Sequence, residues 1–201
     1  MSFLNGFSLG EVEKDKSTGN LKRLRCSWLC HLGIRDNQKR WLVFGIALNE
    51  ILIPHVRPLV EQEVNEEYNT LKRSHSIDSQ SATGRLGKWN KSLKYENING
   101  NDSLPRLRGG KYDYSKFNCQ VLTHTDFAKL YLESYMIHFS AFDDHLDASA
   151  VLLLLGRLPV FPGTVQAAAN SVRNERNDWA HYVFSKWNEA KFKHSFAEME
   201  D

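Results

Sequence analysis

The apolar run Trp41–Ile53 constrains the fold of this chain more than any other feature. It spans 13 residues, and its only strongly polar members are Asn49 and Glu50. A transmembrane helix needs about 20 apolar residues, so this run is too short to cross a bilayer. We expect instead a buried core helix that Pro54 and Pro58 end or kink, because proline removes a backbone donor. No membrane span is predicted.

Apolar residues with helical spacing recur along most of the remaining chain. The pattern predicts further helices in the segments Leu21–Ile34, Val56–Leu71, Thr125–Leu132, Ala148–Leu155, Val165–Val172 and Trp179–Met199. Asp147 directly precedes one of them and is predicted to be its N-cap. No pair of alternating apolar segments is joined by a hairpin turn. The sequence therefore predicts an all-α bundle of about five helices.

One long segment, 72–116, interrupts this helical pattern. It is rich in Ser, Asn and Gly and carries ten Lys or Arg against four Asp or Glu. We interpret it as a polar and basic insert in a single helical domain, 21–201, which follows a flexible N-terminal arm, 1–20. A solvated loop is favoured over an RNA contact, and Ser74–Lys111 is expected to be the most mobile part. The aromatic and apolar residues expected to tie it to the core are Trp89, Leu93, Tyr95, Tyr112 and Tyr114.

Charge and cysteine content narrow the class of protein. The 26 basic and 24 acidic residues give a net charge of +2, so any site for a polyanion must be local. Cys26, Cys30 and Cys119 form an odd, sparse set, which favours free thiols in a reducing compartment, and we expect the cytoplasm. Cys26, Cys30 and His31 lack the spacing and further ligands of a zinc site. We therefore predict no metal and no cofactor.

The segment Ser171–His181 is the strongest candidate for chemistry. It holds two Arg-Asn pairs shortly before a histidine. Asn177 and His181 are four residues apart, about 40° around a helix, and so share a face. Arg176 is about 140° from His181, but its long side chain can reach the same cleft. Guanidinium, amide and imidazole groups together suit phosphodiester cleavage, because they bind phosphate, orient groups and transfer protons.

The stretch from Arg176 to His181, Arg-Asn-Asp-Trp-Ala-His, resembles the hallmark of HEPN domains (higher eukaryotes and prokaryotes nucleotide-binding). That hallmark is an arginine, a polar residue and a histidine after a gap of four to six residues. The run Asp147–Leu155 adds to the resemblance, and together these features make residues Leu24–Met199 resemble a HEPN domain. It is similar to the HEPN domain near the N-terminus of the DAZ-interacting zinc-finger E3 ubiquitin ligase and related animal proteins. No RING-type array is present in the sequence, so the resemblance does not imply ligase activity.

The resemblance implies a homodimer with a composite RNA-cleaving cleft made by two protomers. Arg176, Asn177 and His181 would be its catalytic residues, and the ribose 2′-OH would attack the adjacent phosphate without a metal. RNA is the implied partner, and further domains in a longer parent protein remain open. The residues expected to add RNA contacts are Arg173, Lys186, Arg85, Lys88 and Lys91. The alternative is a noncatalytic dimerisation or RNA-binding scaffold, with Arg176, Asp178 and His181 as ordinary helix residues.

Two other groups of residues are given structural interpretations. Helix capping and surface exposure are favoured over chemistry for His138, Asp143, Asp144, His145 and Asp147. Core or interface packing is favoured over base stacking for the aromatic stripe formed by Trp179, Val183, Phe184, Trp187, Phe192 and Phe196.

Overall fold

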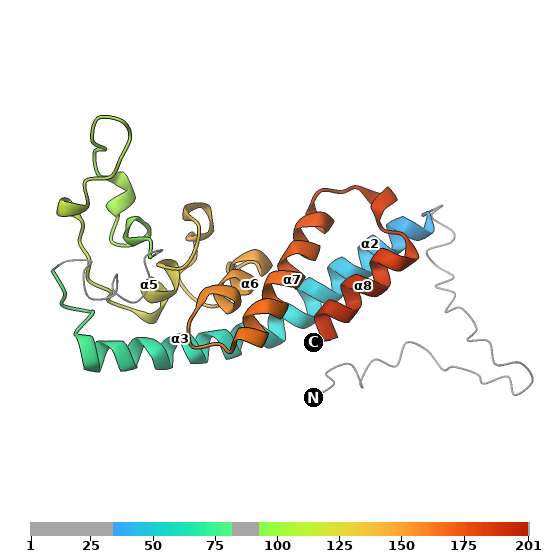
Figure 1. Cartoon of the computed structure of the whole chain (residues 1–201), viewed down its shortest axis with the longest axis horizontal. Coiled ribbons are helices and arrows are strands. Elements are labelled where there is room, and N and C mark those ends of the chain that lie inside the picture. Colours follow the sequence, from blue (N-terminus) through green and yellow to red (C-terminus); the bar gives the residue numbers. More distant parts are fainter. Residues whose placement is uncertain (1–33, 82–92, 201) are drawn as a thin grey trace, which may run out of the picture.

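The computed structural model describes residues 34–81 and 93–200. Within these ranges the regular structure is entirely helical and contains no strand. The predicted all-α bundle is therefore confirmed (Figure 1). The expected arm 1–20, nearly all of the expected helix Leu21–Ile34, and Trp89 lie outside the described residues.

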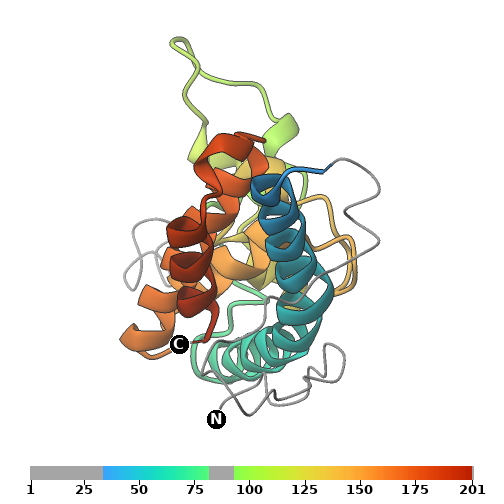
Figure 2. The same cartoon turned by 90° about the vertical axis from the view of Figure 1, so that its right-hand side faces the viewer.

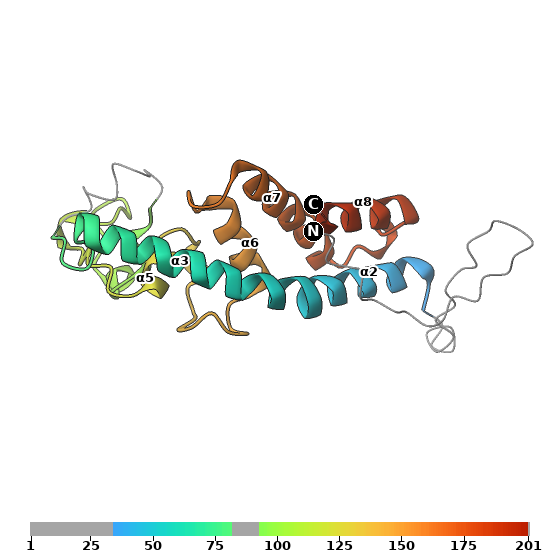
Figure 3. The ribbon, with the colours of Figure 1, turned by 90° about the horizontal axis from the view of Figure 1, so that it is seen from below.

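A continuous helical rod runs along the length of the molecule (Figures 1 and 3). It consists of α2 (Asp36–Ile46), a π-helical segment (Ala47–Leu52) and α3 (Ile53–His75). The expectation that Pro54 or Pro58 would end the helix is wrong, although the rod changes direction near the π-helical segment. The wider π-helical turn lies directly before Pro54, where it makes room for a ring that would clash with the preceding turn of a regular α-helix.

The length of this rod overturns the argument that the apolar helix is too short to cross a membrane. Asp36–His75 is 40 residues long, and by length and composition alone it could cross a membrane. The 13-residue limit used above is wrong because the helix does not end at Pro54. Only 28% of the most apolar 18-residue window is buried. A core helix of a soluble protein passes the same test, so the absence of a membrane span stays a prediction.

The core is centred on α6 (Ala148–Arg157), which packs against α3 and α7 (Gly163–Ala180). Asp147 caps α6 as predicted, because its Oδ1 accepts a hydrogen bond from the Ala150 amide at 2.8 Å. The connection 158–162 is short, so α7 runs back along α6. α8 (Glu189–Glu200) then packs beside α2 and α7 (Figure 2). The largest fully buried side chains are Trp187, Phe44, Phe127, Leu48, Ile53, Ile77, Leu130, Leu132, Leu146, Leu153 and Leu154.

The described part of the insert is packed on the core near Tyr95–Asn101 and Phe117, whereas residues 105–111 are exposed. After α3 ends at His75, residues 93–123 form the 3-10 turns Tyr95–Asn97, Asn101–Ser103 and Tyr114–Lys116, and α5 (His124–Lys129) and a turn at Ser134–Met136 follow. Tyr95 is buried, and Leu93 and Tyr112 pack against the core as expected, whereas Tyr114 is exposed. These turns lie at the opposite end of the rod from α8 (Figure 1).

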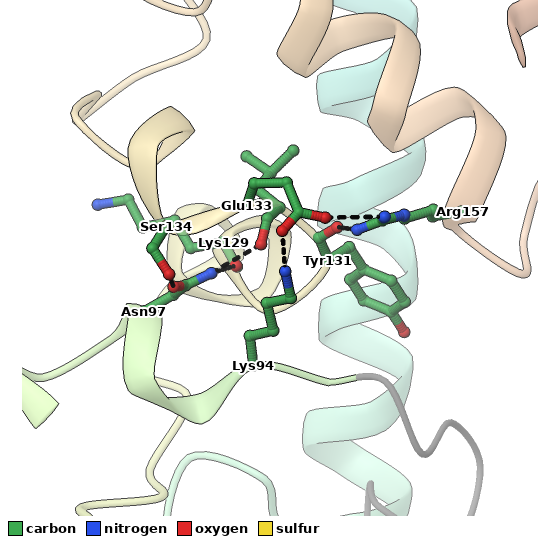
Figure 4. Close-up of polar contacts among 8 residues, drawn as sticks. Lys94, Asn97, Lys129, Tyr131, Glu133, Ser134 and Arg157 are labelled. Carbon is green, nitrogen blue, oxygen red and sulfur yellow. Dashed lines mark hydrogen bonds and ion pairs between the residues drawn. The ribbon is translucent and has the colours of Figure 1, made fainter. Parts of the chain in front are cut away.

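Two polar groups hold this segment to the bundle (Figure 4). The buried Asn97 amide donates to the Lys129 and Leu132 carbonyl oxygens, each at 2.8 Å. The Glu133 carboxylate accepts from Lys94 and from Arg157, the last residue of α6. The insert is thereby joined to the helical core through polar side chains whose positions follow no helical pattern in the sequence.

Candidate functional site

The candidate motif lies on the C-terminal half of α7, and Trp179 fixes this half against α2. The Trp179 and Trp41 rings stack with their centroids 5.1 Å apart. Each indole donates to the other residue's carbonyl oxygen, Trp41 Nε1 at 2.8 Å and Trp179 Nε1 at 3.0 Å. Gly45 makes this approach possible, because a Cβ there would lie 2.5 Å from the Trp179 ring. Trp179 therefore has a packing role, as predicted.

Two acidic residues of the motif segment face α8. The Glu175 carboxylate is buried, lies 2.6 Å from Lys191 Nζ, and accepts from the hydroxyl of the fully buried Ser195. Lys191 also donates to Asp178 at 2.9 Å and lowers the pKa of that carboxyl. Glu175 and Asp178 thus join α7 to α8 and are not free to act on a substrate.

Arg176 faces the start of α6. Its guanidinium lies 3.9 Å from the carboxylate of the N-cap Asp147, and about a quarter of its side chain is exposed. This is a loose ion pair, and a phosphate could compete for the guanidinium. Arg176 therefore lies beside the one face of α7 that neither α2, α6 nor α8 covers.

That free face carries Asn177 and His181. α7 ends at Ala180, and His181 is its C-cap residue with helical φ and ψ, so the 40° spacing predicted from the sequence applies. Asn177 is half-buried and His181 is exposed. The arrangement leaves the imidazole accessible to a ligand, with an amide one helical turn away.

Arg173 shares this face more closely than Arg176 does. It lies four residues before Asn177 and eight before His181, which corresponds to about 40° and 80° around the helix. Its Nε is buried and has no hydrogen-bond partner among the residues that the structure describes. Seven residues lie between Arg173 and His181, more than the four to six of the HEPN hallmark, so Arg173 was predicted as an RNA contact and not as a catalytic residue. Helical periodicity alone would have placed it inside the motif.

The remaining predicted RNA contacts are divided between two regions. Lys186 is exposed in the 3-10 turn Phe184–Lys186 that follows α7, and its charge contributes to the lowered pKa of Asp178. Arg85, Lys88 and Lys91 lie outside the described residues. The described turns of the insert are remote from α7's C-terminal end (Figure 1).

The other side-chain clusters have structural roles. Asp143 accepts from the His145 amide at 2.9 Å, and Asp144 pairs with Arg57 at 2.9 Å, so the predicted surface and capping interpretation is confirmed. Over residues 34–81 and 93–200, no three His, Cys, Asp or Glu side chains form a potential metal site. Cys26, Cys30 and His31 fall outside these ranges. Cys119 is a buried free thiol whose pKa is raised by burial.

The aromatic stripe packs largely as predicted. Trp187 is fully buried against Phe44, with ring centroids 4.8 Å apart, and Phe196 packs on the same core. Sequence reasoning did not single out Tyr182, which follows His181 and is 67% exposed. A bulky residue directly after a helix end was the available signal, because that position favours glycine.

Comparisons with family models, curated proteins and solved structures gave no significant match to this chain. The resemblance to HEPN domains therefore rests on the motif and on the helical pattern.

Proposed function

We propose that this chain is a metal-independent endoribonuclease of the HEPN type that acts as a homodimer. The supporting observation is the exposed His181 at the end of α7, on one face with Asn177 and Arg173 and with Arg176 on its flank. The other faces of α7 are held by α2, α6 and α8. A helix fixed on three sides can hold catalytic groups in a constant position.

The chemistry follows from the groups on this face. A neutral imidazole takes the proton of the ribose 2′-OH, O2′ attacks the adjacent phosphorus, and the bond from phosphorus to O5′ breaks. The leaving O5′ receives a proton from an imidazolium, and the products are a 2′,3′-cyclic phosphate and a 5′-hydroxyl. Arg176 stabilises the charge on the phosphate oxygens, and Asn177 orients the imidazole or the phosphate.

A homodimer explains how one motif can supply both proton transfers. The attacking and leaving oxygens lie on opposite sides of phosphorus, so a single imidazole is poorly placed to serve both. A two-fold axis through the cleft would provide two copies of His181, one as base and one as acid.

The test is cleavage of end-labelled single-stranded RNA by the purified protein in excess chelator. His181→Ala should reduce the rate at least about a hundredfold. His138→Ala, which removes another exposed histidine, should leave it unchanged, and a fully 2′-deoxy substrate should not be cut. A wild-type protein that cuts no RNA, or a His181→Ala variant that cuts equally well, would contradict the proposal.

The contact between Arg176 and Asp147 favours the alternative, a noncatalytic dimerisation or RNA-binding scaffold. In that case Arg176 would serve mainly to join α7 to α6. The same assay separates the two functions, because a scaffold would dimerise or bind RNA in the chelator buffer without cutting it.

A further inference from the structure

Tyr182 has a backbone conformation that is unusual for a tyrosine. Its φ is 57°, in the left-handed region, and it directly follows the C-cap residue of α7. Glycine is the usual residue at this position, because a Cβ makes the left-handed conformation costly. The chain therefore tolerates strain at the residue next to His181.

The turn itself does not require an aromatic side chain. The Tyr182 amide donates to the Trp179 carbonyl oxygen at 3.2 Å, and the Tyr182 carbonyl oxygen accepts from the Phe184 amide at 3.1 Å. Glycine or asparagine could make both bonds with less strain. Strain that the local backbone does not explain is often found at functional sites.

The Tyr182 ring is supported on one side and open on the other. Its centroid lies 5.5 Å from that of Trp41, which also contacts Trp179 and Phe184 at 5.1 and 5.2 Å. Despite this support, Tyr182 is 67% exposed. A large ring held in place with an open side resembles the aromatic platforms on which unpaired bases stack.

A cavity lies next to this aromatic cluster. Phe184 lines it together with Ser185 and the first residues of the rod, Arg35, Asp36, Asn37 and Gln38. Its volume of about 350 Å³ is within the range of small-ligand pockets. A guanidinium, a carboxylate and two amide side chains beside an aromatic ring offer donors and acceptors for the edges of a base.

We propose that Tyr182 stacks on one base of single-stranded RNA and thereby holds the adjoining phosphodiester at His181. The inference rests on the proposed function of the α7 site, but stacking can be measured without cleavage. Tyr182 and His181 are consecutive residues at one helix end, with Cα atoms about 3.8 Å apart, so RNA bound on the ring passes close to the residue that carries the imidazole. Stacking does not depend on base identity, so the platform would accept many sequences.

The experiment measures binding of a labelled, fully 2′-O-methylated single-stranded RNA by fluorescence anisotropy, since this probe has no free 2′-OH. Tyr182→Ala should weaken binding at least about fivefold, and Tyr182→Phe should bind within about twofold of wild type. Tyr135→Ala is the matched control, because Tyr135 is 72% exposed in the remote turn Ser134–Met136. Tyr182→Gly should keep or raise the melting temperature while losing the same affinity as Tyr182→Ala.

The outcomes distinguish this inference from the proposed nuclease. If Tyr182→Ala weakens binding but the wild type cuts no RNA, the platform stands and the nuclease fails. The platform is wrong if the wild type does not bind the probe, or if Tyr182→Ala binds as tightly as the wild type. It is also wrong if Tyr182→Ala only converts a dimer to monomers, because the ring would then belong to an interface between two copies.

Discussion

At the scale of single residues, Asp147 has two roles that can be separated. It caps α6 through the Ala150 amide and lies 3.9 Å from Arg176. Asparagine caps helices as well as aspartate does, so Asp147→Asn should change the free energy of unfolding by less than about 0.5 kcal/mol. The lost charge should free Arg176 and strengthen RNA binding about two- to fivefold, as measured by anisotropy.

Asp144→Asn is the control for that experiment. This substitution removes the same charge from the same loop, but the Asp144 carboxylate pairs with Arg57 rather than with Arg176. An equal gain in both variants would show a general effect of charge and would contradict a specific release of Arg176.

Gly45 is the residue on which the fixed position of Trp179 depends. Gly45→Ala places a Cβ 2.5 Å from the indole ring, and such overpacking costs about 1 to 3 kcal/mol. Urea unfolding should show this loss. Gly163→Ala is the matched control, because nothing lies within 4 Å of its added Cβ and alanine favours the helix. A fully stable Gly45→Ala variant would mean that α2 and α7 can shift apart.

The residue scale also shows what the sequence could and could not predict. The cap at Asp147 was predictable because capping depends on neighbours within one turn. The contact of Arg176 with Asp147 and the approach of Trp179 to Gly45 were not, because they depend on how helices far apart in sequence pack. The sequence could therefore show which arginine shares the face of His181, but not that Arg176 pairs with Asp147.

At the scale of elements, helical periodicity predicted α6, the first half of α7 and the all-α class. It predicted one helix over Trp179–Met199, where the structure has the end of α7, a 3-10 turn and α8. The proline rule was misleading at Pro54, where a π-helical turn lets α2 continue into α3. Leu93 and Tyr95 were predicted as anchors of the insert, but its backbone was not predicted, because short 3-10 turns fixed by side chains such as Asn97 have no repeat to detect. Local rules fail at both places because tertiary contacts determine the backbone there.

Glu133 offers a test of how the insert is held to the core. Hydrogen bonds from Lys94 and Arg157 lower the pKa of its carboxyl below 4.5. Because the folded pKa is lowered, the stabilisation is complete above the ordinary carboxyl range and is lost as the pH falls through the folded value. Glu133→Gln should cost about 1 kcal/mol near neutral pH and should flatten the acid side of the stability curve.

Urea unfolding at a series of pH values would measure both effects. Glu66→Gln, at an exposed position of α3, is the control and should change neither the stability at neutral pH nor its acid dependence. If the stability of Glu133→Gln falls at acid pH as steeply as that of the wild type, the hydrogen bonds of Glu133 with Lys94 and Arg157 do not link the insert to α6.

At the scale of the whole molecule, the chain leaves apolar side chains uncovered along the rod. Val43 and Ile46 of α2 and Leu59 of α3 are exposed. The candidate site is similarly open, since His181 and Tyr182 both face solvent. Both features are compatible with an assembly in which a second copy completes the molecule.

The proposed composite site makes a quantitative prediction about mixtures of wild type and variant. If each cleft needs His181 from both protomers, mixing wild type with His181→Ala at constant total concentration should reduce activity as the square of the wild-type fraction. An equal mixture would then retain roughly one quarter of the activity, whereas independent protomers would retain about one half. Initial cleavage rates in chelator, measured after subunit exchange, give the curve, and sedimentation confirms the dimer. Mixing wild type with His138→Ala should not change the cleavage rate. If activity falls linearly with the wild-type fraction in the His181→Ala mixtures, or if the protein is a monomer at all concentrations, one copy of the α7 face is sufficient.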